Sequence, residues 1–214
     1  EKAVRSGYKE AKAELELLER VRDALGRGVP VRSLEVSPEE TQVLKGFSFL
    51  TAKPVLYVAN TGEDEPSGGE LSERLREAVK GEVLPLSAKV EGEIMELEDP
   101  EERKAFLEDL GLEEPGVNRL IRASYRLLGL ITFYTTVHDK LQAWPIPRGT
   151  SAQEAAGEIH SDIERGFIRA EVVSWKDLIR TGSWAELHRL GAVRSEGRDY
   201  EVQDGDVVVF HFRT

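Results

Sequence analysis

Apolar residues recur at spacings of three and four in the first part of the chain. Residues 8–25 (YKEAKAELELLERVRDAL) alternate charged side chains with a narrow apolar stripe, formed by Leu15, Leu18, Val21 and Leu25. This period predicts an amphipathic helix, which the following glycines and Pro30 would end. A stripe this narrow favours one arm of an antiparallel helical hairpin. A helix packed on a globular core is the alternative.

The middle of the chain alternates strand-like and helix-like segments. Ser37-Pro38-Glu39-Glu40 has the cap, proline and glutamate that start a helix, which we expect to end near Phe49. Residues 54–59 contain few polar side chains, which predicts a central parallel strand covered on both faces. The next expected elements are a helix over 71–79, a strand over 83–86, and helices that start at Asp99-Pro100 and Pro115. The order strand, helix, strand, helix predicts a parallel α/β sheet.

The pattern changes after Gly129. Residues 131–137 and 141–146 are rich in β-forming side chains and flank His138-Asp139-Lys140, which predicts a hairpin. The remaining expected elements are a helix over 152–164, a strand over 167–173, a short helix over 175–180, and strands over 199–202 and 207–212. Strands and helices in this order predict a small β-grasp module that resembles ubiquitin.

Composition narrows the possible classes of protein. The 214 residues contain no cysteine, which excludes disulfides and thiolate metal sites and fits a cytoplasmic protein. No apolar run reaches the roughly 18 residues of a membrane span, so no membrane partner is expected. The net charge of −11 disfavours non-specific binding to nucleic acid. Residues 51–130 hold most of the excess acid, so the two flanks are the better candidates for contact with an anionic partner.

The stretch KPVLYVANTGED contains the first candidate site, at Asn60-Thr61-Gly62-Glu63. In P-loop GTPases an Asn-Lys-x-Asp turn after a strand reads guanine, because the aspartate accepts from two base donors. Here Glu63 replaces the aspartate and Thr61 replaces the lysine. Adenine presents one donor and one acceptor, so the loop predicts a base site with relaxed or altered specificity. A simple turn asparagine after a strand is the alternative.

Ser87-Ala88-Lys89 supports the base-site interpretation. P-loop GTPases end the next strand with a similar turn, whose backbone amide reaches the base. However, the chain contains neither G-x-x-x-x-G-K-S/T nor any Gly-Lys pair, so it lacks a loop that would bind the β- and γ-phosphates. We therefore expect no catalytic residue, no metal ligand and no hydrolysis by this chain alone.

Four further residues are candidates for contacts with RNA or a protein partner: His160, Arg165, Arg169 and Trp184. The histidine and the two arginines have simpler interpretations, whereas Trp184 is the tryptophan to test for stacking on bases. A histidine at a helix end commonly makes a local polar contact, and the two arginines have acidic neighbours that favour a solvated, salt-bridged surface. For Trp144 and Trp175 we expect core packing, while the acidic run 91–102 is typical of a solvated helix face.

The chain resembles the YchF/EngD-type Obg-like ATPases. The matching runs are AKAELELLE, LKGFSFLTAKPVLYVAN, LGLEEPGVNRLIRASYRLLGL, FYTTVHDKLQAWPI, GTSAQEAAGEIHSDIERGFIRAEVVSW and EGRDYEVQDGDVVVFHF. The resemblance implies that residues 1–50 are the return arm of a helical coiled-coil insertion, residues 51–130 the C-terminal part of a G domain, and residues 131–214 a TGS domain of β-grasp fold. Glu1 opens directly into a helical pattern, so we expect a fragment whose phosphate-binding loop lies upstream.

The resemblance also implies a function. Members of this family hydrolyse ATP, often in preference to GTP, hold Mg²⁺ through upstream residues, and are associated with the ribosome and RNA in the cytoplasm. The expected base contacts are Asn60, the backbone of Thr61, Glu63, Ser87 and Ala88. The run between Leu178 and Gly191 matches only loosely. The alternatives are a non-enzymatic RNA- or ribosome-binding adaptor, and another TGS-bearing protein such as a threonyl-tRNA synthetase or a stringent-response enzyme, which would share residues 131–214 only.

Overall fold

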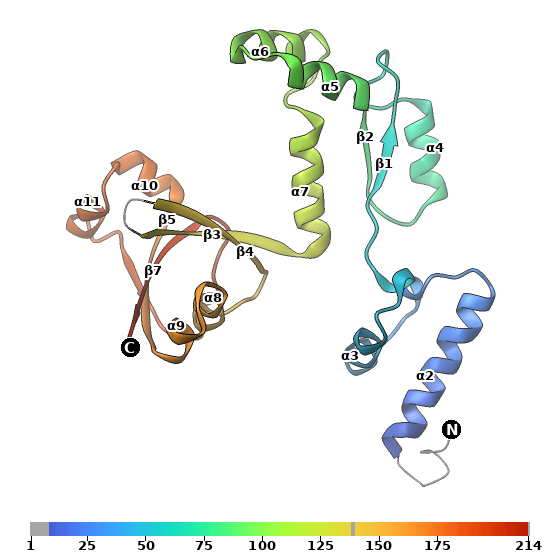
Figure 1. Cartoon of the computed structure of the whole chain (residues 1–214), viewed down its shortest axis with the longest axis horizontal. Helices are drawn as coiled ribbons and strands as arrows, with labels where there is room; N and C mark the ends of the chain where they lie inside the picture. Colours follow the sequence, from blue (N-terminus) through green and yellow to red (C-terminus); the bar gives the residue numbers. More distant parts are fainter. Residues whose placement is uncertain (1–8, 138–139, 214) are drawn as a thin grey trace.

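The computed structural model describes residues 9–137 and 140–213. It begins with α2 (Lys9–Gly26), a 3-10 turn (Val31–Ser33), α3 (Pro38–Phe47) and a second 3-10 turn (Leu50–Ala52) (Figure 1). The predicted capping box of α3 is confirmed: Glu40 N–H donates to Ser37 Oγ at 3.2 Å, and Ser37 N–H donates to the Glu40 carboxylate at 2.9 Å.

The face of α2 that is buried differs from the predicted apolar stripe. The buried residues are Leu17, Val21 and Ala24, whereas Leu25 is 38% exposed. The cause is tertiary: α2 packs against its own downstream segment, where Val31 and Leu44 complete the cluster. The buried face of α2 is therefore the face that lies against this segment, and it is shifted by about one residue from the predicted stripe.

A short parallel sheet follows, made of β1 (Tyr57–Asn60) and β2 (Val83–Leu86), with α4 (Glu70–Ala78) between them. The parallel pairing was predicted correctly, and Tyr57 is opposite Val83. The expectation of a central strand over 54–59 is wrong. β1 starts at Tyr57 and Val58 is 43% exposed, because among the described residues β1 pairs with β2 alone. All four residues of β2 are buried instead.

Three helices connect this sheet to the second one: α5 (Ala88–Glu96), α6 (Pro100–Asp109) and α7 (Gly116–Leu128). Both predicted starts are confirmed. Asp99 caps α6 by accepting from the N–H of Glu101 at 2.9 Å. Pro115 offers no side-chain acceptor to α7, and the Glu91 carboxylate of α5 accepts from the N–H groups of Gly116 at 2.6 Å and Val117 at 3.2 Å instead. The start of α7 is therefore held against α5, and α7 leads directly into β3 (Figure 1).

The second sheet is mixed and has the order β4-β3-β7-β5-β6. Its strands are β3 (Leu130–Val137), β4 (Lys140–Pro147), β5 (Phe167–Ser174), β6 (Arg194–Glu196) and β7 (Asp206–Phe212). The predicted hairpin is confirmed as the antiparallel pair of β3 and β4, while its turn residues His138 and Asp139 lie outside the described residues. Within this sheet, β3 and β7 are the only parallel pair among the described residues.

Helices cover both faces of this sheet. Adjacent residues of a strand point to opposite faces, so neighbouring valines pack into different cores. On one face Val172 and Val208 join a core with Phe133 and the alanines of α8 (Ala152–Ile159). On the other, Val173 and Val207 pack with Leu187 of α11 (Trp184–Arg189). The two remaining helices are α9 (Ser161–Arg165) and α10 (Trp175–Thr181), and Figure 1 shows α8 and α9 together, apart from α10 and α11.

Three expectations for this region are wrong. The single helix over 152–164 is two helices, because His160 has an extended backbone and α9 turns back until Glu164 lies against Gly157. The strand over 199–202 is replaced by one isolated bridge from Glu201 to Ser151, and β6 takes the sheet edge instead. Trp175 is 43% exposed, because it is at the start of the surface helix α10, so it is no core residue.

Candidate functional site

The candidate site forms where β1 and β2 end. Because the strands are parallel, their carboxyl ends meet at one edge, and Asn60 is opposite Leu86 in the register. Asn60 ends β1, while Ser87 and Ala88 follow β2 immediately. Two segments that are 28 residues apart in the chain therefore become neighbours, at the edge where ligands commonly bind open α/β sheets.

Two hydrogen bonds join these segments. Asn60 Oδ1 accepts from the N–H of Ala88 at 2.9 Å, and the N–H of Thr61 donates to the carbonyl of Leu86 at 2.9 Å. Ser87 is buried and caps α5, with its Oγ accepting from the N–H of Val90 at 3.5 Å. Asn60, Thr61, Ser87 and Ala88 thus come together as the sequence predicted.

Glu63 is held by a residue that the sequence analysis did not name as a site residue. Its Oε1 atom lies 2.6 Å from Lys89 Nζ, and both side chains are at least half exposed. The hydrogen bond and the charge of Glu63 raise the pKa of Lys89. Lys89 follows Ala88 directly in Ser87-Ala88-Lys89, so its position in that turn was the signal that could have identified it.

The loop between Thr61 and α4 is anchored to β2. At Gly68, with φ of +106°, a Cβ atom would lie 2.9 Å from Pro85 Cβ, so only glycine fits this close approach. The buried Ser72 Oγ donates to the carbonyl of Gly69 at 2.7 Å and accepts from its N–H at 3.0 Å. Thr61 Oγ1 is buried and has no hydrogen-bond partner within the described residues.

The donor set indicates which parts of a nucleotide this site could hold. The N–H groups of Thr61 and Ala88 are bonded within the protein, so the side-chain amide of Asn60 and the carboxylate of Glu63 are the groups that suit the polar edge of a purine base. Residues 9–137 and 140–213 contain no group of three or more histidine, cysteine, aspartate or glutamate residues that could hold a metal ion. None of the helices that the structure describes is long and apolar enough to cross a membrane.

The four candidate partner-contact residues make local contacts within the C-terminal sheet and its helices. His160 Nδ1 accepts from the N–H of Asp162 at 3.1 Å and so caps α9, and Arg165 pairs with Asp162 at 2.6 Å. Trp184 begins α11, and its Nε1 donates to His188 Nε2 at 3.0 Å. The simpler interpretations therefore describe the contacts of His160 and Arg165, and a role of any of the four in binding a partner stays a prediction.

Arg169 belongs to a larger charge cluster. Its guanidinium lies 2.6 Å from Glu171, and His188 and His211 approach the same carboxylate at 3.4 and 3.5 Å. The hydrogen bond from Arg169 and the approach of His211 lower the pKa of Glu171. The cluster joins β5, β7 and α11.

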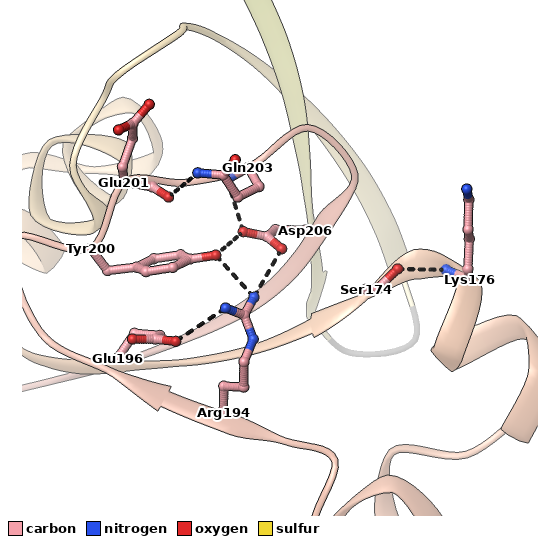
Figure 2. Close-up of polar contacts among 8 residues, drawn as sticks. All are labelled: Ser174, Lys176, Arg194, Glu196, Tyr200, Glu201, Gln203 and Asp206. Carbon is pink, nitrogen blue, oxygen red and sulfur yellow. Dashed lines mark hydrogen bonds and ion pairs between the residues drawn. The ribbon is translucent and has the colours of Figure 1, made fainter.

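A second polar network, shown in Figure 2, joins β6, β7 and the segment between them. The buried Asp206 accepts from Tyr200 Oη at 2.7 Å and from the N–H of Gln203 at 2.9 Å, and Arg194 donates to Tyr200 Oη at 2.9 Å. Burial and the hydrogen bond to Asp206 raise the pKa of Tyr200 to about 12. The network ties the segment between β6 and β7 to both strands and so stabilises it.

The sheet order defines a mixed α/β protein, and its candidate site lies at the carboxyl edge of two parallel strands. A family model named YchF-GTPase_C, with the description "Protein of unknown function (DUF933)", matches residues 130–213. Two relatives named "Ribosome-binding ATPase YchF" are similar over nearly the whole chain. The Bacillus subtilis (strain 168) protein is 47% identical over 210 residues, which cover 95% of this chain, and the Escherichia coli O157:H7 protein is 44% identical over 215 residues, which cover 99%. The chain belongs to the YchF family.

The solved structure titled "Structure of the Schizosaccharomyces pombe YchF GTPase" has the same fold, with a TM-score of 0.83 and 25% identity over 95% of this chain and 55% of that one. A GTP-binding protein from Pyrococcus horikoshii OT3, at 21% identity and a TM-score of 0.55, is similar in fold. The chain spans 57% of the length of the Bacillus relative and 59% of the Escherichia relative. Most of the residues that the Bacillus relative matches lie outside residues 130–213, which the family model matches.

Proposed function

We propose that this chain supplies the base-recognition half of a purine-nucleotide site in a cytoplasmic, ribosome-associated protein that binds and hydrolyses ATP or GTP with Mg²⁺. The observation that carries the proposal is the bond from the N–H of Ala88 to Asn60 Oδ1 at 2.9 Å. It brings together the two turns that the sequence singled out for base recognition. The residues proposed to contact the base are Asn60, Thr61 through its backbone, Glu63, Ser87 and Ala88.

Under this proposal, the phosphates bind to residues outside this sequence. A phosphate-binding loop needs glycine-rich backbone amides and a lysine, and the chain has no such motif. The names of the relatives, which describe a ribosome-binding ATPase, support a nucleotide and a ribosome as ligands. We therefore expect residues 1–214, tested alone, to bind ATP negligibly.

We further propose three structural units: a coiled-coil return arm over 1–50, the C-terminal part of a G domain over 51–130, and a TGS domain of β-grasp fold over 131–214. The mixed five-stranded sheet formed by β3 to β7 supports the proposed TGS domain. The family match over 130–213 supports it as well. The TGS and helical units are the proposed contacts with the ribosome or RNA, and His160, Arg165, Arg169 and Trp184 are the residues to test there.

Calorimetric titration of the full-length natural protein with ATP and GTP tests the nucleotide site. Wild type should bind, and Asn60→Ala should weaken binding of both nucleotides, since it removes the side chain that joins the two turns. Asn118→Ala is the matched control, because Asn118 is exposed on α7. Unchanged affinity in Asn60→Ala would contradict the proposal.

The second candidate is an adaptor that binds RNA or the ribosome without hydrolysis, and the missing phosphate-loop motif favours it. Co-sedimentation with ribosomes, with and without ATP, separates the two candidates. Pelleting of the full-length natural protein that ATP does not change would favour the adaptor, while failure to pellet would count against both candidates.

A further inference from the structure

An apolar groove lies between α10 and the paired strands β3 and β4, which are neighbours in Figure 1. Tyr134 is opposite Val207 in the register of β3 and β7, and Val207 belongs to the buried core that includes Leu187 of α11. The floor of the groove is therefore part of the packed sheet. The residues that line the groove are Tyr134, Leu141, Trp175, Leu178, Ile179 and Val207.

Three of the side chains that line this groove are exposed although they are large and apolar. Leu141 is 67% exposed, Ile179 72% and Trp175 43%. Trp175 and Ile179 are four residues apart on α10, so they lie on the same side of that helix, and Leu141 joins them from the edge strand β4. Apolar side chains that gather on a surface, unlike single exposed ones, mark interaction sites. The groove is such a gathering, and it is uncovered in the part of the chain that the structure describes.

The size and chemistry of the groove favour side chains of another protein as its occupant. Four of the six lining residues are aliphatic, whereas single-stranded nucleic acid is bound largely through aromatic faces on which its bases stack. The cavity has a volume of about 240 Å³, which is below the about 300–1,000 Å³ of typical small-molecule sites. Apolar side chains of a protein partner satisfy both conditions, because they need no hydrogen bonds and can enter the groove one or two at a time.

Two cations border the groove on α10. Lys176 directly follows Trp175, and its Nζ atom lies 5.8 Å from the centre of the indole ring. Arg180 directly follows Ile179; it pairs with Asp177 at 2.7 Å, yet its side chain is 77% exposed. Both positive charges are accessible to a partner although the chain as a whole carries a net charge of −11. Carboxylates beside the inserted apolar side chains would therefore be complementary to this border.

We propose that this groove is a docking site for a protein segment of the ribosome, one that inserts apolar side chains into the groove and places acidic residues beside Lys176 and Arg180. The inference rests on the proposed function, because it names the surface and the chemistry of one contact with the ribosome. It assigns that contact to a protein component instead of RNA. An amphipathic helix with apolar residues three or four positions apart is the simplest segment of this kind.

Co-sedimentation of the full-length natural protein with purified ribosomes from its source organism measures the affinity of this contact. Ile179→Asp should weaken binding about tenfold or more, because it removes an aliphatic contact and puts a charge into the groove. Ile168→Asp is the matched control: Ile168 is also exposed, at 48%, but it lies on β5 and does not line the groove. Its affinity should stay close to that of wild type.

Photo-cross-linking identifies the class of the partner. The substitution Lys176→benzoylphenylalanine puts a photoreactive group beside the groove and leaves its apolar lining intact. In the complex with ribosomes it should cross-link to a ribosomal protein, at a peptide that contains both apolar and acidic residues. A cross-link to RNA, a cross-link within the chain itself, or no cross-link in a complex that pellets would overturn the proposal.

The affinities decide the remaining outcomes. An affinity of Ile179→Asp equal to that of wild type would overturn the docking site, and so would equal losses in Ile179→Asp and Ile168→Asp. If Ile179→Asp melts below wild type, Leu141→Asp takes its place under the same criterion. Failure of the wild-type protein to pellet with ribosomes would instead refute the ribosome association in the proposed function.

Discussion

Asn60 Oδ1 accepts a hydrogen bond from the backbone N–H of Ala88 at 2.9 Å, across 28 residues of sequence. The bond fixes the end of β1 to the start of α5, where the candidate base site lies. Loss of this side chain should affect stability as well as binding, since the Ala88 amide would lose its partner. We expect Asn60→Ala to lower the free energy of unfolding by about 1 kcal/mol, measured by urea denaturation. Asn118→Ala should leave it unchanged, and equal effects of the two would contradict this assignment.

Glu91 caps α7 from a different helix. Its carboxylate accepts from the N–H groups of Gly116 and Val117, where it also interacts favourably with the helix dipole. We expect Glu91→Ala to lower the free energy of unfolding by about 1–2 kcal/mol. Glu96→Ala removes an exposed carboxylate from the same helix and should change stability by less than about 0.5 kcal/mol. A difference too small to measure between the two variants would refute the cap.

Gly205 and Gly149 have nearly the same φ angle but different surroundings. Their φ angles are +86° and +87°; a Cβ atom at Gly205 would lie 2.4 Å from Trp175 Cδ1, whereas one at Gly149 would meet nothing within 4 Å. Gly149→Ala should therefore lower the free energy of unfolding by about 1–2 kcal/mol, from backbone strain alone. Gly205→Ala should lower the free energy of unfolding by about 1–3 kcal/mol more, because the indole of Trp175 must move. Thermal melts compare the two, and equal costs would show that the contact with Trp175 is unimportant.

Tyr200 links stability to alkaline pH. Its pKa rises from 10.0 to about 12 in the folded chain, so the folded state keeps a proton that the unfolded state loses. Its contribution is fully present below pH 10 and is lost as the pH rises towards 12. Tyr200→Phe should lower the free energy of unfolding by about 1–3 kcal/mol near neutral pH, because the buried Asp206 loses a hydrogen-bond donor.

Urea titrations from about pH 9 to about pH 11.5 measure this effect. The difference in stability between wild type and Tyr200→Phe should shrink across that interval, because only wild type has the ionisable hydroxyl at this position. Other tyrosines and lysines titrate in both proteins and cancel in the comparison. A difference that stays constant with pH would contradict the linkage.

Local features of the sequence predicted most elements of the fold. Ser37 with Glu40, and Asp99 before Pro100, mark helix starts whose hydrogen bonds lie within four residues. The hairpin and the parallel β1–β2 pair followed from side-chain alternation and element order. For the candidate site, Asn60 and Ala88 could be paired in advance because parallel strands end at one edge of a sheet.

The sequence by itself therefore determined the caps, the element order and the two turns, because each depends on residues close together in the chain or on a general rule of topology. Only the tertiary structure decided which face of α2 is buried, that His160 interrupts a helix, that Asp206 and Tyr200 form a network, and that Lys89 reaches Glu63. Each of these depends on contacts between segments far apart in sequence, where the energy comes from packing and charge pairing that no local pattern records.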